Sequence, residues 1–441
     1  MNSTTISVST TAKYRVNPEQ LASSAVRIVN VAFDVGSESL HWAMELPDQT
    51  LSGKCDNTSC DIRTTLRQIS AKAAKHGYGE LRVICESTGI YHRRLLQLAG
   101  SLGMRTCLVH GEAVAKFRTI QFADHGKTDD RDPRAALTVA KVGKLIRDRK
   151  LDKLYAQLRE LHRLVHRCEA RIKVAKCELH ADLRNLFADL RLDKSVLYGP
   201  TGQALIEEFA GNSHRIVAAG EEVFCAAMKA RSKHTKQATL KKIWNAAVES
   251  ADGDNDGLAA TLAEIQAAAV QQLYAEITAF LQQRDELEQR MQQLYLQLQA
   301  DDARLPSPCK GVVTLRLLSR LVAEIGPPDD FRTLSQLMRY AGLNLCERQS
   351  GKWRGRTKIS RRGRRELRYV LNLMAIPLVG RQKLFGDYYW KKKETDKMPG
   401  QKANVCVMRK ILKMFFGWYH SGKPFDRERV FVMASEYSKA A

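Results

Sequence analysis

The chain has 441 residues, of which 44% are hydrophobic and 27% charged, and 71 Lys and Arg against 48 Asp and Glu give a formal net charge of +23. This composition is ordinary for a globular protein and excludes collagen-like and wholly disordered chains. The length predicts two or three domains, each able to bury a core. The longest late apolar stretch, residues 369–380, is too short to span a bilayer, so we expect no membrane partner.

The N-terminal part of the chain has a polar start followed by alternating strands and helices. Residues 1–27 have no apolar core, so we expect a disordered tail rather than a secretory signal. Apolar patterns predict strands at 81–87, at 105–111 and within 28–46, where a tight turn joins two of them. Helices are predicted at 61–76 and 91–103, and another begins with Asp132 as N-cap and Pro133 at its first position. This order is typical of a mixed α/β sheet.

Two long helices are predicted in the middle of the chain. Residues 151–190 and 258–298 carry apolar residues every three or four positions and are long enough for an antiparallel coiled coil. A mixed segment, 191–257, lies between them and ends in a polar linker at 249–257. A proline-rich joint at 304–311 opens a basic, mostly helical C-terminal region. We therefore expect three domains, at residues 28–150, at 151–303 with 191–257 inserted, and at 304–441.

Cysteine and histidine spacings do not favour a metal site. The ten cysteines are scattered and form no Cys-x-x-Cys pair, so we expect reduced thiols in the cytoplasm. His162 and His166 lie four residues apart with Cys168 nearby. We interpret them as part of a charged helix face rather than as zinc ligands.

The positive charge is concentrated in the last third of the chain. Residues 301–441 carry 30 Lys and Arg against 13 Asp and Glu, and Arg348 to Arg368 holds ten basic residues and one acid. Such density favours a polyanion partner, because each cation placed on a phosphate releases counterions. A membrane surface is disfavoured since no amphipathic apolar face accompanies the run. The predicted nucleic-acid contacts are Arg348, Lys352, Arg354, Arg356, Lys358, Arg361, Arg362, Arg364 and Arg365.

Four acidic residues are placed where a metal site can form. Asp34 ends a predicted strand, Glu86 ends a later one, and Asp129 and Asp132 lie three residues apart where a loop enters a helix. Carboxylates gathered in this way repel each other unless divalent cations neutralise them, and two metals about 3.5–4 Å apart suit phosphoryl transfer. Each acid also has a structural interpretation, as a turn residue, an exposed strand end or a helix cap.

Ser350 is the candidate nucleophile. It stands beside Gly351 among Arg348, Lys352 and Arg354, and such cations stabilise negative charge that develops on an attacked phosphorus. A serine in a basic loop also serves simply as a phosphate contact. The alternative serines are Ser307, Ser335 and Ser360, and no histidine is evident as a base.

These motifs together resemble the DEDD-type transposases of bacterial insertion sequences, the bridge-RNA-guided recombinases. The N-terminal resemblance rests on three segments, FDVGSESLHWAM, ICESTGIYHRRLLQLAGSLGMRTCLVHG and HGKTDDRDPRAAL. The C-terminal resemblance rests on QLMRYAGLNLCERQSGKWRGRTKISRRGRRELRYVLNLMA and HSGKPFD. The similarity covers roughly residues 28–147 and 305–426, in the order of the family.

The resemblance implies a fold and a reaction. Residues 28–150 would form an RNase H-like domain similar to the RuvC resolvase, in which Asp34, Glu86, Asp129 and Asp132 hold Mg²⁺, with Mn²⁺ able to replace it. Ser350 would be the nucleophile of the C-terminal transposase domain and form a covalent phosphoserine link to DNA. A structured noncoding guide RNA would pair with donor and target DNA. A homo-oligomer, a dimer or a tetramer, would bring the two duplexes together on the bacterial nucleoid.

Some positions depart from the family, and two other functions fit the same residues. Pro133 stands where a small alanine commonly follows the last acid, and Gln349 and Lys352 replace expected neighbours of the serine. Residues 307–326 resemble a helix-hairpin-helix element in which the usual Gly-x-Gly is changed. The alternatives are a RuvC-like nuclease in which metal-activated water attacks, and a non-catalytic nucleic-acid-binding protein.

Overall fold

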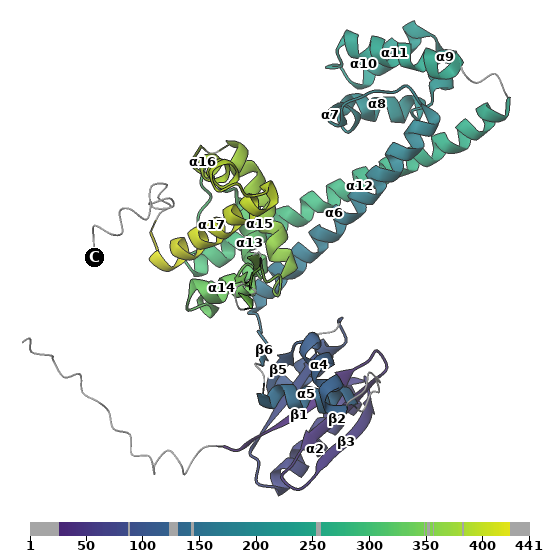
Figure 1. Cartoon of the computed structure of the whole chain (residues 1–441). Helices are drawn as coiled ribbons and strands as arrows, with labels where there is room; N and C mark the ends of the chain where they lie inside the picture. Colours follow the sequence, from purple (N-terminus) through teal and green to yellow (C-terminus); the bar gives the residue numbers. More distant parts are fainter. Residues whose placement is uncertain are drawn as a thin grey trace, which may run out of the picture. The chain divides into compact units, whose positions relative to one another are not determined.

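In the computed structural model the chain forms two compact units, whose boundary along the sequence lies between Lys150 and Leu151 (Figure 1). The residues described are 26–86, 89–122, 131–142, 145–252, 257–347, 349–350, 353–355, 357–381 and 383–423. The expected tail at 1–27 lies outside them except for its last two residues. All ten cysteines are free thiols. Within these ranges, no helix has the length and apolar character needed to cross a membrane.

The N-terminal unit is built on a six-stranded mixed sheet. Its strands are β1 (Ile28–Val35), β2 (Ser39–Glu45), β3 (Thr50–Asp56), β4 (Glu80–Glu86), β5 (Arg105–Val109) and β6 (Ile146–Arg147). They lie in the order β3-β2-β1-β4-β5-β6, in which β1, β4 and β5 are parallel and the other pairs antiparallel. Strand β3 was not predicted, because its residues are half-buried or exposed and lack an apolar run.

Helices cover both faces of this sheet. The helices are α2 (Ser59–Lys75), α3 (His92–Ser101), α4 (Gly111–Phe122) and α5 (Arg131–Val142). Side chains alternate between the two faces of a strand. Phe33 therefore packs with the α2 and α3 residues Leu66 and Leu95, whereas its neighbour Ala32 packs on the other face with Ala136 of α5. The predicted α/β domain is present, and its layers are consistent with an RNase H-like domain.

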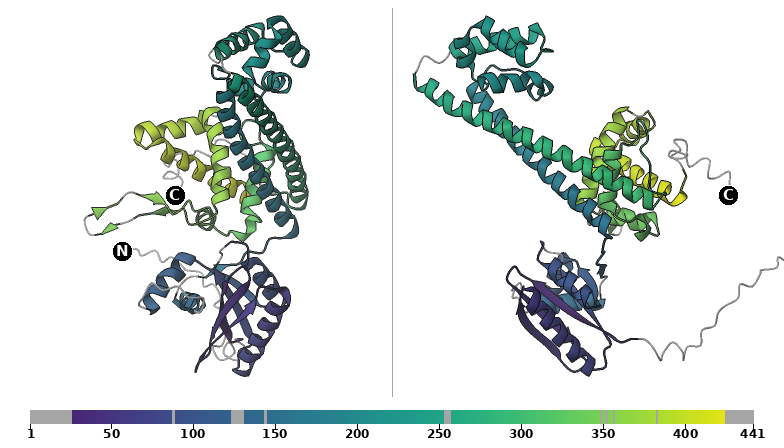
Figure 2. Two further views of the ribbon diagram at one scale, coloured as in Figure 1. Left: turned by 90° about the vertical axis from the view of Figure 1, so that its right-hand side faces the viewer. Right: turned by 180° about the vertical axis from the view of Figure 1, so that it is seen from behind.

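Two long helices, α6 (Lys153–Leu186) and α12 (Gly257–Asp301), run alongside each other in the second unit (Figures 1 and 2). Leu158 near the start of α6 shares a buried cluster with Tyr295 near the end of α12. Leu183 near the end of α6 shares another cluster with Val270 in the first half of α12. The two helices are therefore antiparallel.

The described part of the segment between the long helices consists of short helices joined by turns and loops. It contains α7 (Lys194–Leu197), α8 (Pro200–Phe209), α9 (Ser213–Ala219), α10 (Glu221–Arg231) and α11 (Gln237–Asp252). Helices α8 to α11 have their own core, in which the tilted rings of Phe209 and Phe224 pack with centroids 5.3 Å apart. The polar linker expected at 249–257 begins as the last turn of α11, and residues 253–256 of it lie outside the described part.

The C-terminal region packs on the adjoining ends of α6 and α12. Its helices are α13 (Leu315–Ile325), η1 (Pro328–Asp330), α14 (Leu334–Tyr340), α15 (Arg365–Arg381), α16 (Lys383–Trp390), η2 (Lys391–Thr395) and α17 (Gly400–Ser421). Short strands β7 (Leu345–Cys346), β8 (Gln349–Ser350), β9 (Trp353–Arg354) and β10 (Lys358–Ile359) connect α14 to α15. One core joins Leu158 of α6 with Leu321 of α13 and Leu371 of α15. The boundary expected near residue 304 therefore falls inside one compact unit.

A buried ion cluster fastens α13 to α6 and to the start of α15. His162 and Glu324 are 1% and 2% exposed, and His162 Nδ1 lies 2.7 Å from Glu324 Oε1. Arg364 forms a salt bridge with the same carboxylate. Burial alone would raise the pKa of Glu324, but the His162 hydrogen bond and the Arg364 charge outweigh it and lower the pKa to about 2. The interpretation of His162 as part of a charged helix face was wrong, because its side chain is buried and pairs with Glu324.

We expect Glu324→Gln to destabilise the second unit by about 3 kcal/mol at neutral pH, the free energy equivalent of this pKa difference. Because the folded-state pKa lies below the ordinary value of 4.5, the stabilisation is complete above pH 4.5 and is lost as the pH falls toward 2. Urea unfolding at several pH values measures this. The difference in free energy of unfolding between the native protein and the variant should decrease as the pH falls from 4.5 to 2. A difference that does not change with pH would contradict the lowered pKa of Glu324.

Candidate active site

Asp34 and Glu86 lie side by side at one edge of the N-terminal sheet. Strands β1 and β4 are parallel neighbours, and Phe33 is in register with Cys85. The next residues along each strand are Asp34 and Glu86, so their backbones are about 5 Å apart, the usual spacing of paired strands. Asp34 is two residues after Ala32, and Glu86 is two residues after Ile84. Because every second side chain of a strand lies on the same face, both acids belong to the face covered by α4 and α5. Both side chains are half-buried.

Gly111 makes room for the Glu86 carboxylate. It is the first residue of α4, and a Cβ atom built there would overlap the Glu86 carboxyl group. The carboxylate thus lies against the N-terminus of a twelve-residue helix, where unpaired amides favour negative charge. The sequence carries no local signal for this contact, since 25 residues separate the two positions.

Asp132 reaches the same face of the sheet from α5. This helix packs across β1, β2 and β4, with Ala136 one turn beyond Asp132 in its core face. Asp132 is the second residue of α5 and lies inside the helix, which corrects its expected place as N-cap. It is 9% exposed and accepts a hydrogen bond from Arg118 Nη1 of α4. The sequence did not identify this partner, because only the packing of α4 on α5 brings the two together.

The acidic residues suit a hard divalent cation by their chemistry. Asp129 lies outside the described residues, so the arrangement can be judged only for Asp34, Glu86 and Asp132. Among the residues that the structure describes, no group of three or more His, Cys, Asp or Glu side chains is close enough to bind one ion. The donors are all carboxylate oxygens, which Mg²⁺ and Mn²⁺ prefer. The register of β1 and β4 supplies two neighbouring donors, which fits such an ion.

Ser350 lies near the end of a two-stranded arm in the second unit. Cys346 pairs with Lys358 at the base of the arm, and Ser350 pairs with Trp353 further out. Figure 2 shows the arm projecting from the helices of its unit. The Ser350 side chain is exposed. A serine in this position is accessible to a large substrate such as a nucleic acid.

The alternative serines have different surroundings. Ser360 is half-buried, and its hydroxyl donates a 2.5 Å hydrogen bond to Asn344 Oδ1. Ser307 accepts a hydrogen bond of 2.9 Å from Gln299 Nε2. Ser335 is exposed and lies in the regular helix α14. Ser350 alone among the four belongs to the basic arm.

The predicted nucleic-acid contacts divide into exposed and internally paired side chains. Lys358, Arg361, Arg362 and Arg365 are exposed. Arg364 instead pairs with the buried Glu324, so its charge is already balanced inside the unit. Three of the predicted contacts, Arg348, Lys352 and Arg356, lie outside the described part. For Arg354 only the backbone is described.

A tight backbone contact fixes the start of α15 against the end of α14. Gly363 lies so close to Gly342 that a Cβ atom on Gly363 would overlap the Gly342 backbone. Arg361 has a positive φ of 55° and donates its backbone amide to the Gly342 carbonyl oxygen at 3.0 Å. These contacts position the exposed cations of residues 361–365 beside the base of the Ser350 arm.

Two family models match the chain, and the candidate residues fall within them. A DEDD transposase model, described as Transposase, matches residues 31–188, the range that contains all four acids. The model described as Transposase IS116/IS110/IS902 family matches residues 311–390, the range that contains Ser350 and the basic run. No curated protein matches the chain. From these two matches, and from the mixed sheet that carries the acids, the chain belongs to the DEDD-type transposases of the IS110 family, which are enzymes that act on DNA.

Proposed function

We propose that this transposase is an RNA-guided recombinase that cuts and rejoins DNA with an acidic metal site and a serine nucleophile. The observation that carries the proposal is the parallel register that sets Asp34 beside Glu86, beneath the helix that carries Asp132. Exposed Ser350 in the second family-matching segment supplies the nucleophile. The acids and the serine belong to different units and act on one phosphodiester.

Asp34, Glu86, Asp129 and Asp132 would hold Mg²⁺. The bound ion would neutralise these carboxylates and stabilise negative charge on the attacked phosphate. Arg118 of α4 forms a salt bridge with Asp132 and so balances the charge of this carboxylate. Gly111 leaves the space in which the Glu86 carboxylate lies.

Ser350 would attack the phosphorus of a DNA strand. Its hydroxyl loses a proton and its Oγ forms a bond to phosphorus while one phosphorus–oxygen bond of the strand breaks. The DNA oxygen that leaves takes up a proton. Rejoining reverses these steps, with a DNA hydroxyl attacking the phosphoserine. Arg361, Arg362 and Arg365 are exposed cations that can hold the strand's phosphates.

The partners of this reaction are donor and target DNA and a structured guide RNA. The net charge of +23 and the basic run support binding to phosphate backbones more than to base edges. A homo-oligomer, a dimer or a tetramer, would hold two DNA duplexes together. The reaction would take place on DNA in the bacterial cytoplasm.

Gly111→Ala should disable the acidic site without unfolding the protein. The added methyl group meets the flexible end of Glu86, so the carboxylate moves while the backbone stays in place. A displacement of this size typically lowers a reaction rate about 100-fold. DNA cleavage rate and circular dichroism measure the two effects. Gly417→Ala is the control, because a methyl group there meets open space. Full activity of Gly111→Ala would contradict the role of Glu86.

Ser350→Ala should abolish the SDS-resistant protein–DNA adduct, because the alanine has no oxygen to bond to phosphorus. The adduct is detected by denaturing gel and mapped by mass spectrometry, with element-junction DNA and RNA transcribed from the element's flanks. Ser335→Ala, which changes another exposed serine of the same unit, should keep the adduct. An adduct in Ser350→Ala would assign the nucleophile to another serine. DNA cleavage by the native protein without any adduct would indicate attack by water.

Replacing Arg361, Arg362 and Arg365 together by alanine should weaken duplex DNA binding and its salt dependence. If each contacts one phosphate, the slope of log K against log salt falls by about 2.7. Fluorescence anisotropy over a salt series measures it. The control removes the same charge from exposed residues of α2, Arg63, Arg67 and Lys75. An equal change in both variants would mean that the basic run has no special contact with DNA.

A further inference from the structure

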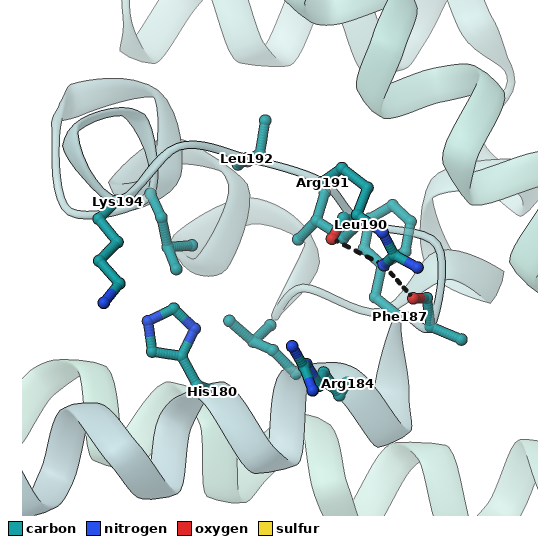
Figure 3. A pocket seen from close by; sticks show the side chains of 10 residues that line it. His180, Arg184, Phe187, Leu190, Arg191, Leu192 and Lys194 are labelled. Carbon is teal, nitrogen blue, oxygen red and sulfur yellow. Dashed lines mark hydrogen bonds between the residues drawn. The ribbon is translucent and has the colours of Figure 1, made fainter.

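A cavity of about 530 Å³ lies between the last turns of α6 and the segment that follows it. Figure 3 shows the cavity, with His180 and Arg184 on α6 and Lys194 on the opposite side. Its size is within the range of small-ligand sites. The residues that line it are His180, Leu183, Arg184, Phe187, Ala188, Leu190, Arg191, Leu192, Lys194 and Leu197.

The charged and titratable residues in this lining are all basic. His180 and Arg184 lie one turn apart on α6, and Arg191 and Lys194 come from the facing segment. Arg191 Nη1 donates to the carbonyl oxygens of Ala188 and Leu190, at 2.7 and 3.4 Å, which fixes the guanidinium at the rim. The lining contains no Asp or Glu that would balance these cations.

The cations of the cavity destabilise one another. Burial lowers the pKa of His180, and the charges of Lys194, Arg184 and Lys176 lower it further. Burial, followed by the charges of Arg284 and Lys194, also lowers the pKa of Lys176, which lies outside the lining. Like charges gathered at a concave surface favour a bound anion, because the anion relieves their repulsion.

The rest of the cavity wall is apolar. Leu183, Phe187 and Leu197 are buried, and Leu190 and Leu192 are half-buried. A free inorganic anion gains no binding free energy from apolar side chains. A nucleotide uses both parts of the cavity, because the cations hold its phosphate while the flat face of its base covers the apolar side chains.

We propose that this cavity binds an unpaired nucleotide of RNA, with its phosphate on Arg184 and Lys194 and its base against Leu190 and Leu192. Folded RNA offers unpaired loop nucleotides at no cost, whereas duplex DNA must first be unpaired. The choice of RNA rests on the guide RNA of the proposed function, while the basic cavity stands independently of it. The segment that supplies Arg191 and Lys194 lies outside both family matches, which end at 188 and begin again at 311.

The test compares Arg184→Ala/Lys194→Ala with Arg167→Ala/Lys173→Ala in the full chain. All four side chains are exposed, so the fold should survive, and the control pair removes the same charge from α6 outside the cavity. Anisotropy with a short unpaired polyuridine RNA should show about tenfold weaker binding by the cavity variant only. Its salt slope should fall by about 1.4, the value for two single-strand phosphate contacts.

A crosslink locates the contact directly. Polyuridine that carries 4-thiouridine should give adducts within residues 180–197, and these should disappear in the cavity variant. Equal weakening in both variants, or adducts only elsewhere, would overturn the proposal. The same response with polythymidine DNA would assign the cavity to single-stranded DNA instead. Recombination with flank RNA is measured separately, so loss of polyuridine binding and failure of the proposed function are distinguishable.

Discussion

The parallel pairing of β1 with β4 is the constraint on which the account of the acidic site depends. Because Phe33 is in register with Cys85, the next residue on each strand is a carboxylate on the same face. A shift of one residue would turn Glu86 toward the opposite face, away from Asp34 and α5. The buried apolar residues of both strands resist such a shift, so the core holds two like charges together. Their repulsion is what a divalent cation would relieve.

The second unit contains buried charges that are paired with each other. Glu324 draws together His162 of α6 and Arg364 at the start of the C-terminal helices. Arg320 and Glu288 form a second buried pair between α13 and α12. These pairs are internally balanced, whereas the side chains of Lys358, Arg361, Arg362 and Arg365, and of Arg184, Arg191 and Lys194 at the cavity, are exposed. Within residues 361–365, Arg364 is therefore paired inside the unit while the other three arginines are exposed.

The sequence predicts those features that repeat locally and misses those that depend on distant contacts. The apolar runs before Asp34 and Glu86 predicted two strand ends, and the long periodic stretches predicted α6 and α12. Strand β3 has no apolar run to reveal it, although Gly53 lies against the Trp42 ring of its neighbour. The pairing of Glu324 with His162 spans 162 residues, and no spacing in the sequence indicates it.

The candidate site likewise contains residues that the sequence predicts and residues that only the folded structure brings together. The acids and Ser350 were predicted from their spacing, from the surrounding charge and from their resemblance to a family, and the two family models cover those positions. Arg118 and Gly111 act through packing of α4 on the sheet, which residue type alone does not predict. The basic cavity combines residues from α6 and from the segment after it, so it becomes visible only when the chain is folded.

The most direct test of the account is whether Ser350 needs the acids of the other unit. Asp34→Asn keeps the size of the side chain and removes its charge, and the serine is untouched. With Mg²⁺, flank RNA and junction DNA, the account predicts that native protein forms the SDS-resistant adduct at Ser350 and that Asp34→Asn forms none while still binding RNA. An undiminished adduct at Ser350 in the Asp34→Asn protein would contradict the central claim, because the serine would then act without the acidic site.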